Sequence, residues 1–317
     1  MTAELFEIEG NPIPENATVG RLAMRDGVRL RYARFGATGR PLKGTVIIVT
    51  GRNEYIEKYF ETVRDVQARG LGALVFDLRG QGLSDRLISD PAKGYVRDFG
   101  DYVGDLEEIF EQVALPDCRG PFFILGHSAG GLVALMAAPW MVNRVRRMVL
   151  LAPLIGYPDL PFSVANMRRF TGALRMLGLG RIYVSGVRDR RAVTPFAVNK
   201  LTTDHMRYER NLELRRLHPD LALAGPTATW IHASFRAIEQ VQDPDFLARV
   251  NIPTLIVAAG ADEVVSTPAI EHLTLRLRAG SLVTIDGARH ELMQESDIFR
   301  EQVLAAFDAF VPGSGEL

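Results

Sequence analysis

The feature that most constrains the fold is a regular alternation of short apolar segments with longer segments of helical periodicity. The short segments are residues 44–50, 73–78, 121–125, 145–152, 254–259 and 281–285. Short apolar runs of this kind are typical of strands buried on both faces of a sheet. Helical spacing covers residues 55–69, 102–113, 129–140, 268–277 and 298–310. This order predicts an α/β fold with a mostly parallel, doubly wound sheet.

The N-terminal segment has a different pattern. Residues 5–9, 22–24 and 28–35 resemble short strands, and Asp26-Gly27 is a turn signal between the last two. Antiparallel strands joined by such a tight turn form hairpins. We therefore expect a β-meander at the start of the chain.

A stretch without any strand pattern interrupts the alternation between residues 155 and 242. It contains the predicted helices 164–177, 194–200, 207–214 and 226–241. Thr194 with Pro195, and Pro226, are expected at the first positions of the second and fourth helices. The predicted organisation is a core of residues 1–154 and 243–317 with a helical cap of residues 155–242. We interpret the cap as a lid over a substrate pocket; the alternative is a stabilising extension.

The predicted cap also carries an excess of positive charge. It holds 13 basic and 7 acidic residues, a net charge of +6, within a chain whose net charge is −1. A solvated surface is the simplest explanation. The alternative is attraction to anionic lipid head groups or to a phosphate on the substrate.

Composition limits the partners and the compartment. The net charge of −1 argues against binding to nucleic acid, and the single cysteine, Cys118, cannot form an internal disulfide. Residues 1–10 lack the pattern of a secretory signal, and the apolar runs fall far short of the roughly 18–20 residues of a membrane span. We expect a soluble cytoplasmic protein. Peripheral contact of the cap with the inner face of the membrane stays open, as does the oligomeric state.

The chemistry begins at a Gly-x-Ser-x-Gly motif, residues 126–130, with Ser128 at its centre. An apolar strand precedes the motif and a helix of small residues follows it, which is the context of a nucleophile elbow. The glycines permit a sharp turn, and the serine hydroxyl then projects beside a helix N-terminus that favours negative charge. The sequence therefore predicts Ser128 as a nucleophile.

A serine hydroxyl needs a base, and the base needs a group to orient it. His290 follows the last predicted strand by five residues and is the expected base, whereas the adjacent His127 has a diverging side-chain direction. We interpret His205, His218, His232 and His272 as surface or packing residues. Asp262, just beyond the strand 254–259, is the expected acid, with Glu263 as a nearby competitor. The order Ser128, Asp262, His290 is typical of this motif.

The oxyanion formed during acyl transfer needs two backbone N–H donors. Ala129, directly after the nucleophile, is expected to provide one. Arg52, in the loop after the strand 44–50, is expected to provide the other. No metal and no cofactor is predicted, because the sequence has neither a zinc-protease pattern around His290 nor a glycine-rich phosphate loop.

Several of these motifs together resemble a known family. They are residues 50–59, 77–84, 126–131, 225–227 and 260–262, together with His290. The whole chain is similar to α/β hydrolases of the monoacylglycerol lipase and lysophospholipase type. Many members of that group carry a His-Gly pair after the third strand, whereas this chain has Gly51-Arg52, as the bacterial lysophospholipase L2 branch does. The resemblance implies an α/β-hydrolase fold with a helical cap.

The function implied is hydrolysis of the carboxylic ester of single-acyl-chain lipids, with lysophospholipids as the leading hypothesis. A monoacylglycerol lipase or a short-chain carboxylesterase is the alternative within the same chemistry. A lipid-binding protein without catalytic activity is the alternative from another class. The substrate in each case is a small lipid ester, and its head group and acyl length are left open.

Overall fold

One eight-stranded sheet organises the chain, of which the computed structural model describes residues 4–39, 42–158, 163–184 and 188–312. The strand order is β1-β2-β4-β3-β5-β6-β7-β8. The strands are β1 (Ala17–Ala23), β2 (Arg29–Phe35), β3 (Thr45–Val49), β4 (Gly72–Phe76), β5 (Phe122–His127), β6 (Val145–Leu151), β7 (Thr254–Ala259) and β8 (Gly280–Ile285). Strands β3 to β8 are parallel, and β2 pairs antiparallel with both β1 and β4. The prediction of a mostly parallel α/β sheet is confirmed.

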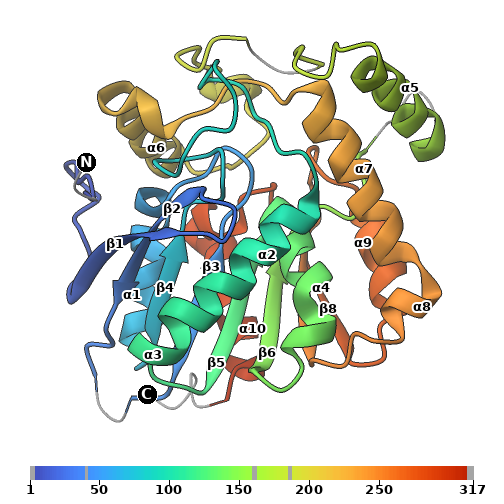
Figure 1. Cartoon of the computed structure of the whole chain (residues 1–317). Helices are drawn as coiled ribbons and strands as arrows, with labels where there is room; N and C mark the ends of the chain where they lie inside the picture. The colour runs from blue at the N-terminus through green and yellow to red at the C-terminus, as the bar shows by residue number, and fades with distance from the viewer. Residues whose placement is uncertain (1–3, 40–41, 159–162, 185–187, 313–317) are drawn as a thin grey trace.

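Helices cover both faces of this sheet (Figure 1). On one face lie α2 (Phe99–Ile109), which continues through η2 (Phe110–Ala114) and α3 (Leu115–Asp117), and α4 (Ala129–Met141). Behind the sheet lie α1 (Phe60–Ala68), preceded by η1 (Ile56–Tyr59), and α10 (Asp297–Phe310). α9 (Thr267–Thr274) connects β7 to β8, and η5 (Leu292–Gln294) precedes α10. Every helix in the described ranges is too short or too polar to span a bilayer.

The parallel strands bring distant parts of the sequence to one edge. All residues of β3, β5 and β7 are buried, as expected for strands covered on both faces. The loops that follow β3, β5, β7 and β8 leave at the carboxyl ends of these strands. In parallel sheets, ligands bind at that edge. The four loops contain Arg52, Ser128, Asp262 and His290.

The N-terminal prediction is wrong in one element. Residues 5–9 form no strand; Ile8 makes only an isolated bridge to Asn11. The backbone of this segment is instead held by the buried residues beneath it, with the Phe6 N–H donating to Glu57 and the Glu4 carbonyl accepting from Arg31. The hairpin of the meander is present as β1 and β2, and β1 begins five residues before the predicted strand at 22–24.

The described part of residues 155–242 contains helices and no strand. The helices are α5 (Val164–Met176), η3 (Phe196–Val198), α6 (His205–Leu217), η4 (Pro219–Leu221) and α7 (Ala228–Gln242), followed by α8 (Pro244–Leu247). α5 and α6 lie above the upper edge of the sheet (Figure 1). Residues 159–162 and 185–187 of the predicted cap lie outside the described ranges.

Two helix starts in this region differ from prediction. Residues 194–200 contain only a single turn of 3-10 helix, and Pro195 precedes it rather than opening it. α7 begins at Ala228, because the Thr227 side chain caps it by accepting from the Trp230 N–H. Pro226 is therefore outside the helix. A threonine hydroxyl can satisfy a free helical N–H, which neither Gly225 nor Pro226 can do.

A buried ion cluster ties the antiparallel edge of the sheet to its parallel part. Arg31 on β2 is fully buried and donates to Asp77 at 2.7 Å and to both oxygens of Glu57 at 2.7 and 2.8 Å. Asp77 also accepts from the Leu83 N–H at 2.8 Å, which orients the loop 77–84. A side chain at Gly82 would collide with the Asp77 carboxylate. The glycine-rich loop of residues 77–84 after β4 therefore has a structural role, because Gly82 leaves room for the Asp77 carboxylate of this cluster.

Replacing Arg31 with Met is expected to cost about 3–5 kcal/mol of unfolding free energy, because two buried carboxylates lose their counter-charge. Arg29→Met is the matched control on the same strand. Arg29 is 59% exposed and pairs with Asp85 at the surface, so its loss is expected to cost at most about 1 kcal/mol. Urea unfolding of both variants measures the difference, and equal losses would contradict a structural role for the cluster.

Candidate active site

Ser128 occupies a sharp turn between β5 and α4. Its φ of 52° and ψ of −118° are outside the usual regions for a residue with a side chain. The neighbouring glycines make this turn feasible. A Cβ at Gly130 would collide with the backbone oxygen of Val49, and one at Gly126 would approach the Gly131 Cα to 2.9 Å. The turn therefore presents Ser128 at the carboxyl edge of the sheet, as the motif predicts.

His290 and Asp262 lie in line with this serine. The Nε2 atom of His290 is 3.0 Å from Ser128 Oγ, and its Nδ1 atom is 2.8 Å from Asp262 Oδ2. Asp262 is also held by the Val264 and Val265 N–H groups, at 2.7 and 2.9 Å. Burial alone would raise the pKa of Asp262, but His290 and these N–H groups outweigh it and lower the pKa. The carboxylate is thus ionised and oriented to accept from the Nδ1 proton.

The competing acid lies elsewhere. Glu263 forms an ion pair with Lys200 at 3.0 Å, and both side chains are 58% exposed. The expected oxyanion donors are placed at the site, since Arg52 and Ala129 line the same cavity as Ser128 and His290. Within the described residues, neither backbone N–H donates a hydrogen bond to a protein acceptor. Both amides are free to receive an oxygen of a substrate.

The cavity around Ser128 has a volume of about 330 Å³ and combines an apolar wall with a charged one. Residues after β6 and β7, together with the predicted cap, supply the apolar wall: Leu154, Tyr157, Leu201, Leu212, Trp230, Ile231, Val264 and Val265. The charged side chains are Arg52, Glu54, Lys58, Arg215 and Glu291. A volume of this size is typical of small-molecule sites.

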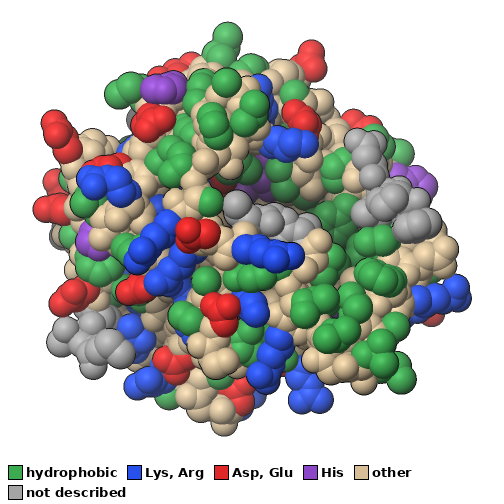
Figure 2. Space-filling model, turned by 90° about the horizontal axis from the view of Figure 1, so that it is seen from above, with side chains coloured by type: hydrophobic (Ala, Val, Ile, Leu, Met, Phe, Trp, Pro, Cys, Tyr) green, Lys and Arg blue, Asp and Glu red, His purple; other side chains and the backbone are tan. Residues whose placement is uncertain are grey.

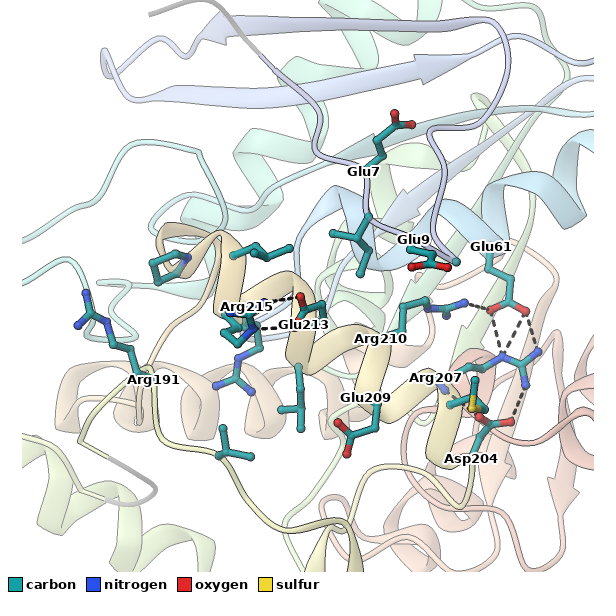
Figure 3. A pocket seen from close by; sticks show the side chains of 18 of the residues that line it. Glu7, Glu9, Glu61, Arg191, Asp204, Arg207, Glu209, Arg210, Glu213 and Arg215 are labelled. Atoms are coloured by element: carbon teal, nitrogen blue, oxygen red, sulfur yellow. Dashed lines mark hydrogen bonds and ion pairs between the residues drawn. The ribbon is translucent and has the colours of Figure 1, made fainter.

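A larger groove of about 1280 Å³ lies along α6, away from Ser128 (Figure 3). Its charges are mostly paired. Glu61 binds Arg207 at 2.6 Å and Arg210 at 2.8 Å, as the close-up shows. Neither Ser128 nor His290 lines this groove, so its size alone does not make it the candidate active site.

The sequence did not reveal a buried carboxylate next to Ser128. Glu54 accepts from the Gly51 N–H at 2.5 Å, from Tyr59 Oη at 2.6 Å and from Lys58 Nζ at 2.9 Å. Its oxygens also lie 3.1 and 3.2 Å from Nδ1 of His127. These bonds hold the loop that carries Arg52 against the turn that carries Ser128. The sequence signal is the presence of three charged residues, Glu54, Glu57 and Lys58, in the segment that follows the buried strand β3.

His127 completes this network and is doubly hydrogen-bonded. Its Nε2 atom lies 3.1 Å from the backbone oxygen of His290, which can only accept, while Nδ1 faces Glu54. Both ring nitrogens therefore donate when Glu54 is ionised, which makes the ring an imidazolium. Burial would lower the pKa of His127, but the charge of Glu54 outweighs it and raises the pKa above the ordinary 6.5. Burial likewise opposes ionisation of Glu54, yet His127 and Lys58 hold its pKa well below 4.5.

Replacing Glu54 with Gln is expected to move the pKa of His127 from above 6.5 to below it, because burial remains while the neighbouring negative charge is lost. NMR titration of the imidazole signals measures this shift. Glu291→Gln is the control, since Glu291 binds Lys58 and not His127, and a smaller shift is expected there. An unchanged His127 pKa in Glu54→Gln would contradict the assigned pair.

The same pair contributes to stability over a defined pH range. Glu54 has a lowered pKa in the folded protein, so its contribution is present above about 4.5 and is lost as pH falls through the folded value. His127 has a raised pKa, so its contribution is complete below about 6.5 and is lost as pH rises through the folded value. Both contributions are complete between about pH 4.5 and pH 6.5. The difference in unfolding free energy between the wild type and Glu54→Gln is therefore expected to be largest in this pH range.

Comparisons with known proteins agree with this architecture. The model of the Hydrolase_4 family, described as "Serine aminopeptidase, S33", matches residues 40–297. Lysophospholipase L2 of Escherichia coli K12 is 33% identical over 297 residues, covering 90% of this chain and 84% of that protein. "Probable lysophospholipase L2" of Haemophilus influenzae is 29% identical, covering 95% and 94%. The monoglyceride lipase of Saccharomyces cerevisiae, at 18% identity, has the same fold, with a TM-score of 0.74 over 94% of this chain and 96% of that one. The chain belongs to the Hydrolase_4 family of α/β hydrolases.

Proposed function

We propose that this protein is a serine hydrolase that cleaves the carboxylic ester of single-acyl-chain lipids, with Ser128, His290 and Asp262 as its catalytic triad. The observation that carries the proposal is the continuous hydrogen-bonded chain from Ser128 Oγ through both nitrogens of His290 to Asp262. In such a chain the imidazole can take the serine proton while the carboxylate stabilises the resulting positive charge. The proposed steps use only side chains, backbone amides and water.

The reaction would begin when Ser128 Oγ attacks the ester carbonyl and His290 Nε2 accepts its proton. The tetrahedral oxyanion would lie between the Arg52 and Ala129 amides, and loss of one such donor typically costs about 2.7–4 kcal/mol of transition-state stabilisation. His290 would then return the proton to the departing alcohol. Water activated by His290 would release the fatty acid from the acyl-serine.

A lysophospholipid is the substrate that we favour. The apolar wall of the cavity suits an acyl chain, and relatives from Haemophilus influenzae and Escherichia coli, similar over most of the chain, carry the name lysophospholipase L2. A monoacylglycerol is the second candidate, because proteins named monoglyceride lipase from mouse and human are also similar to this chain. The two substrates share the ester and the acyl chain and differ in the head group.

Replacing Ser128 with Ala is expected to abolish labelling by a fluorophosphonate and hydrolysis of a p-nitrophenyl ester, because no other group would form the acyl intermediate. Labelled protein on a gel and released nitrophenol are the measurements. Alanine has a Cβ atom, as serine does, so the substitution should leave the strain of the backbone angles at residue 128 unchanged. The unfolding temperature of the variant should therefore change little. Persistent labelling of the variant would overturn the nucleophile.

We also propose that residues 155–242 act as the cap, between core segments 1–154 and 243–317. Support comes from the cavity, whose apolar wall takes Tyr157, Leu201, Leu212, Trp230 and Ile231 from this segment. If residues 155–242 were only a stabilising extension, they would not need to contact the catalytic cavity. The cap would therefore contribute to substrate binding.

A further role of the cap would be peripheral contact with a membrane. Exposed apolar side chains gather on α5 and just after it, with Phe170 56%, Met176 91% and Leu177 74% exposed. Arg169 and Arg175 lie on the same helix. Viewed from above, the molecule exposes hydrophobic side chains among basic ones (Figure 2). An apolar surface bordered by arginines is suited to an interface with anionic lipids.

Met176→Glu is expected to weaken cosedimentation with phosphatidylglycerol vesicles at least about tenfold, because a negative charge then replaces an exposed apolar side chain that would insert into the lipid surface. Leu275→Glu is the matched control. Leu275 is 85% exposed but follows α9, in the predicted core segment 243–317 rather than in the cap. Vesicle binding should therefore be retained in this variant. Equal binding by wild type and Met176→Glu would exclude α5 as the contact.

A further inference from the structure

Two arginines in the catalytic cavity have no acidic partner. Arg52 comes from the loop after β3, and Arg215 comes from α6 in the proposed cap; both line the cavity that contains Ser128. Neither forms an ion pair with any carboxylate of the described residues. We infer that Arg52 and Arg215 form a subsite for the phosphate of a lysophospholipid head group. This inference rests on the proposed ester hydrolase activity and adds the residues that select the substrate.

Arg52 is held in place but keeps donors to spare. One guanidinium nitrogen, Nη1, donates to the backbone oxygen of Ala224 at 3.0 Å, and the guanidinium lies 5.8 Å from the centre of the Trp230 ring. Burial lowers the pKa of this arginine, and the charge of Arg215 acts in the same direction. A partly buried cation with neutral neighbours and a second cation nearby is an environment in which an anion is favourable.

Arg215 is also incompletely bonded. Its Nη2 donates to the backbone oxygen of Arg190 at 3.1 Å, while its Nε is buried without any hydrogen-bond partner. An orphaned buried donor costs about 1–3 kcal/mol unless a ligand or water satisfies it. The other three arginines of α6 all have carboxylates: Arg207 and Arg210 bind Glu61, and Arg216 binds Glu213. Among the arginines of α6, Arg215 alone has no carboxylate partner within the described residues, and it lines both the catalytic cavity and the groove along α6.

The acidic groups of the cavity do not compensate these two charges. Glu54 and Glu291 lie 2.9 and 2.5 Å from the Lys58 ammonium, and Glu54 also binds His127. Both carboxylates are therefore already engaged by other charged groups. An anion entering beside Arg52 and Arg215 would displace no ion pair within the described part of the chain.

The chemistry of a lysophospholipid matches this arrangement. Its phosphate is separated from the scissile ester only by the glycerol carbons, so a phosphate-binding group must lie within about one side chain of the oxyanion donors. Arg52 meets that condition, since its own amide is a proposed oxyanion donor. Guanidinium groups offer several donors in the planar geometry that phosphate oxygens accept. A monoacylglycerol has no charge for either arginine to bind.

The test compares two substrates with the same acyl chain, 1-palmitoyl-lysophosphatidylglycerol and 1-palmitoylglycerol. Arg215→Met is expected to lower the ratio of their kcat/KM values at least about tenfold, chiefly through the KM of the phospholipid, since a charged hydrogen bond is lost. Arg216→Met is the control, because it removes the same charge from the exposed face of α6; its ratio should match the wild type. An unchanged ratio in Arg215→Met would overturn the inference, whether the two kcat/KM values stay the same or fall equally.

Binding provides a measurement that does not require turnover. Ser128→Ala and Ser128→Ala/Arg215→Met are titrated with the ether analogue 1-O-hexadecyl-glycero-3-phosphoglycerol and with 1-O-hexadecylglycerol. The arginine substitution should weaken the phospholipid analogue at least about tenfold more than the glycerol ether. Inorganic phosphate should not compete at the concentration where the ether phospholipid saturates. Competition of equal strength would overturn the assignment to a lipid head group.

Failure of the proposed function has a different signature. If the wild type cleaves neither substrate, the esterase proposal fails while the binding measurement still tests the subsite. If the wild type cleaves both and the ratio ignores Arg215, the esterase proposal stands and the subsite is wrong. Arg52→Met in the binding experiment tests the second arginine, with the same selective loss expected.

Discussion

The geometry around Ser128 depends on the hydrogen bonds and ion pairs of the buried Glu54 carboxylate. This carboxylate accepts from the Gly51 amide, from Lys58 and from His127, and so joins the loop after β3 to the turn after β5. His127 in turn donates to the backbone oxygen of His290. Three loops from separate strands are thereby held together by buried charged groups. In a site of low dielectric such bonds are strong, and losing one partner leaves the others uncompensated.

Charge is distributed around the cavity in two ways. Within the Glu54 network, acidic and basic groups neutralise one another. Within the described residues, Arg52 and Arg215 have no carboxylate partner, while the neighbouring arginines of α6 are paired. The net charge of +6 in residues 155–242 therefore says little by itself. What distinguishes a binding cation from a structural one is whether the fold supplies it with an acidic partner.

Much of the architecture follows from sequence periodicity. The buried parallel strands are continuous apolar runs, and β7 matches its prediction at both ends. The errors fall where local signals compete with tertiary contacts. Residues 5–9 resemble a strand, but the Phe6 N–H binds Glu57, and the carbonyl of Glu4, just before this segment, binds Arg31. The sequence pattern predicts Pro226 at the first position of the helix that is α7. The helix instead begins at Ala228, with Thr227 as its N-cap. Turn and cap chemistry is decided by neighbours that periodicity does not reveal.

The sequence alone determined the sheet, the Ser128 turn and the order of Ser128, Asp262 and His290, because strand periodicity and glycine spacing are local properties. Only the tertiary structure decided that Nε2 of His290 faces Ser128 at 3.0 Å, that Glu54 meets His127, and that no carboxylate of the described residues pairs with Arg215. The first two contacts join residues up to 162 positions apart. Pairing at that separation depends on how the loops pack at the sheet edge, which no local pattern encodes.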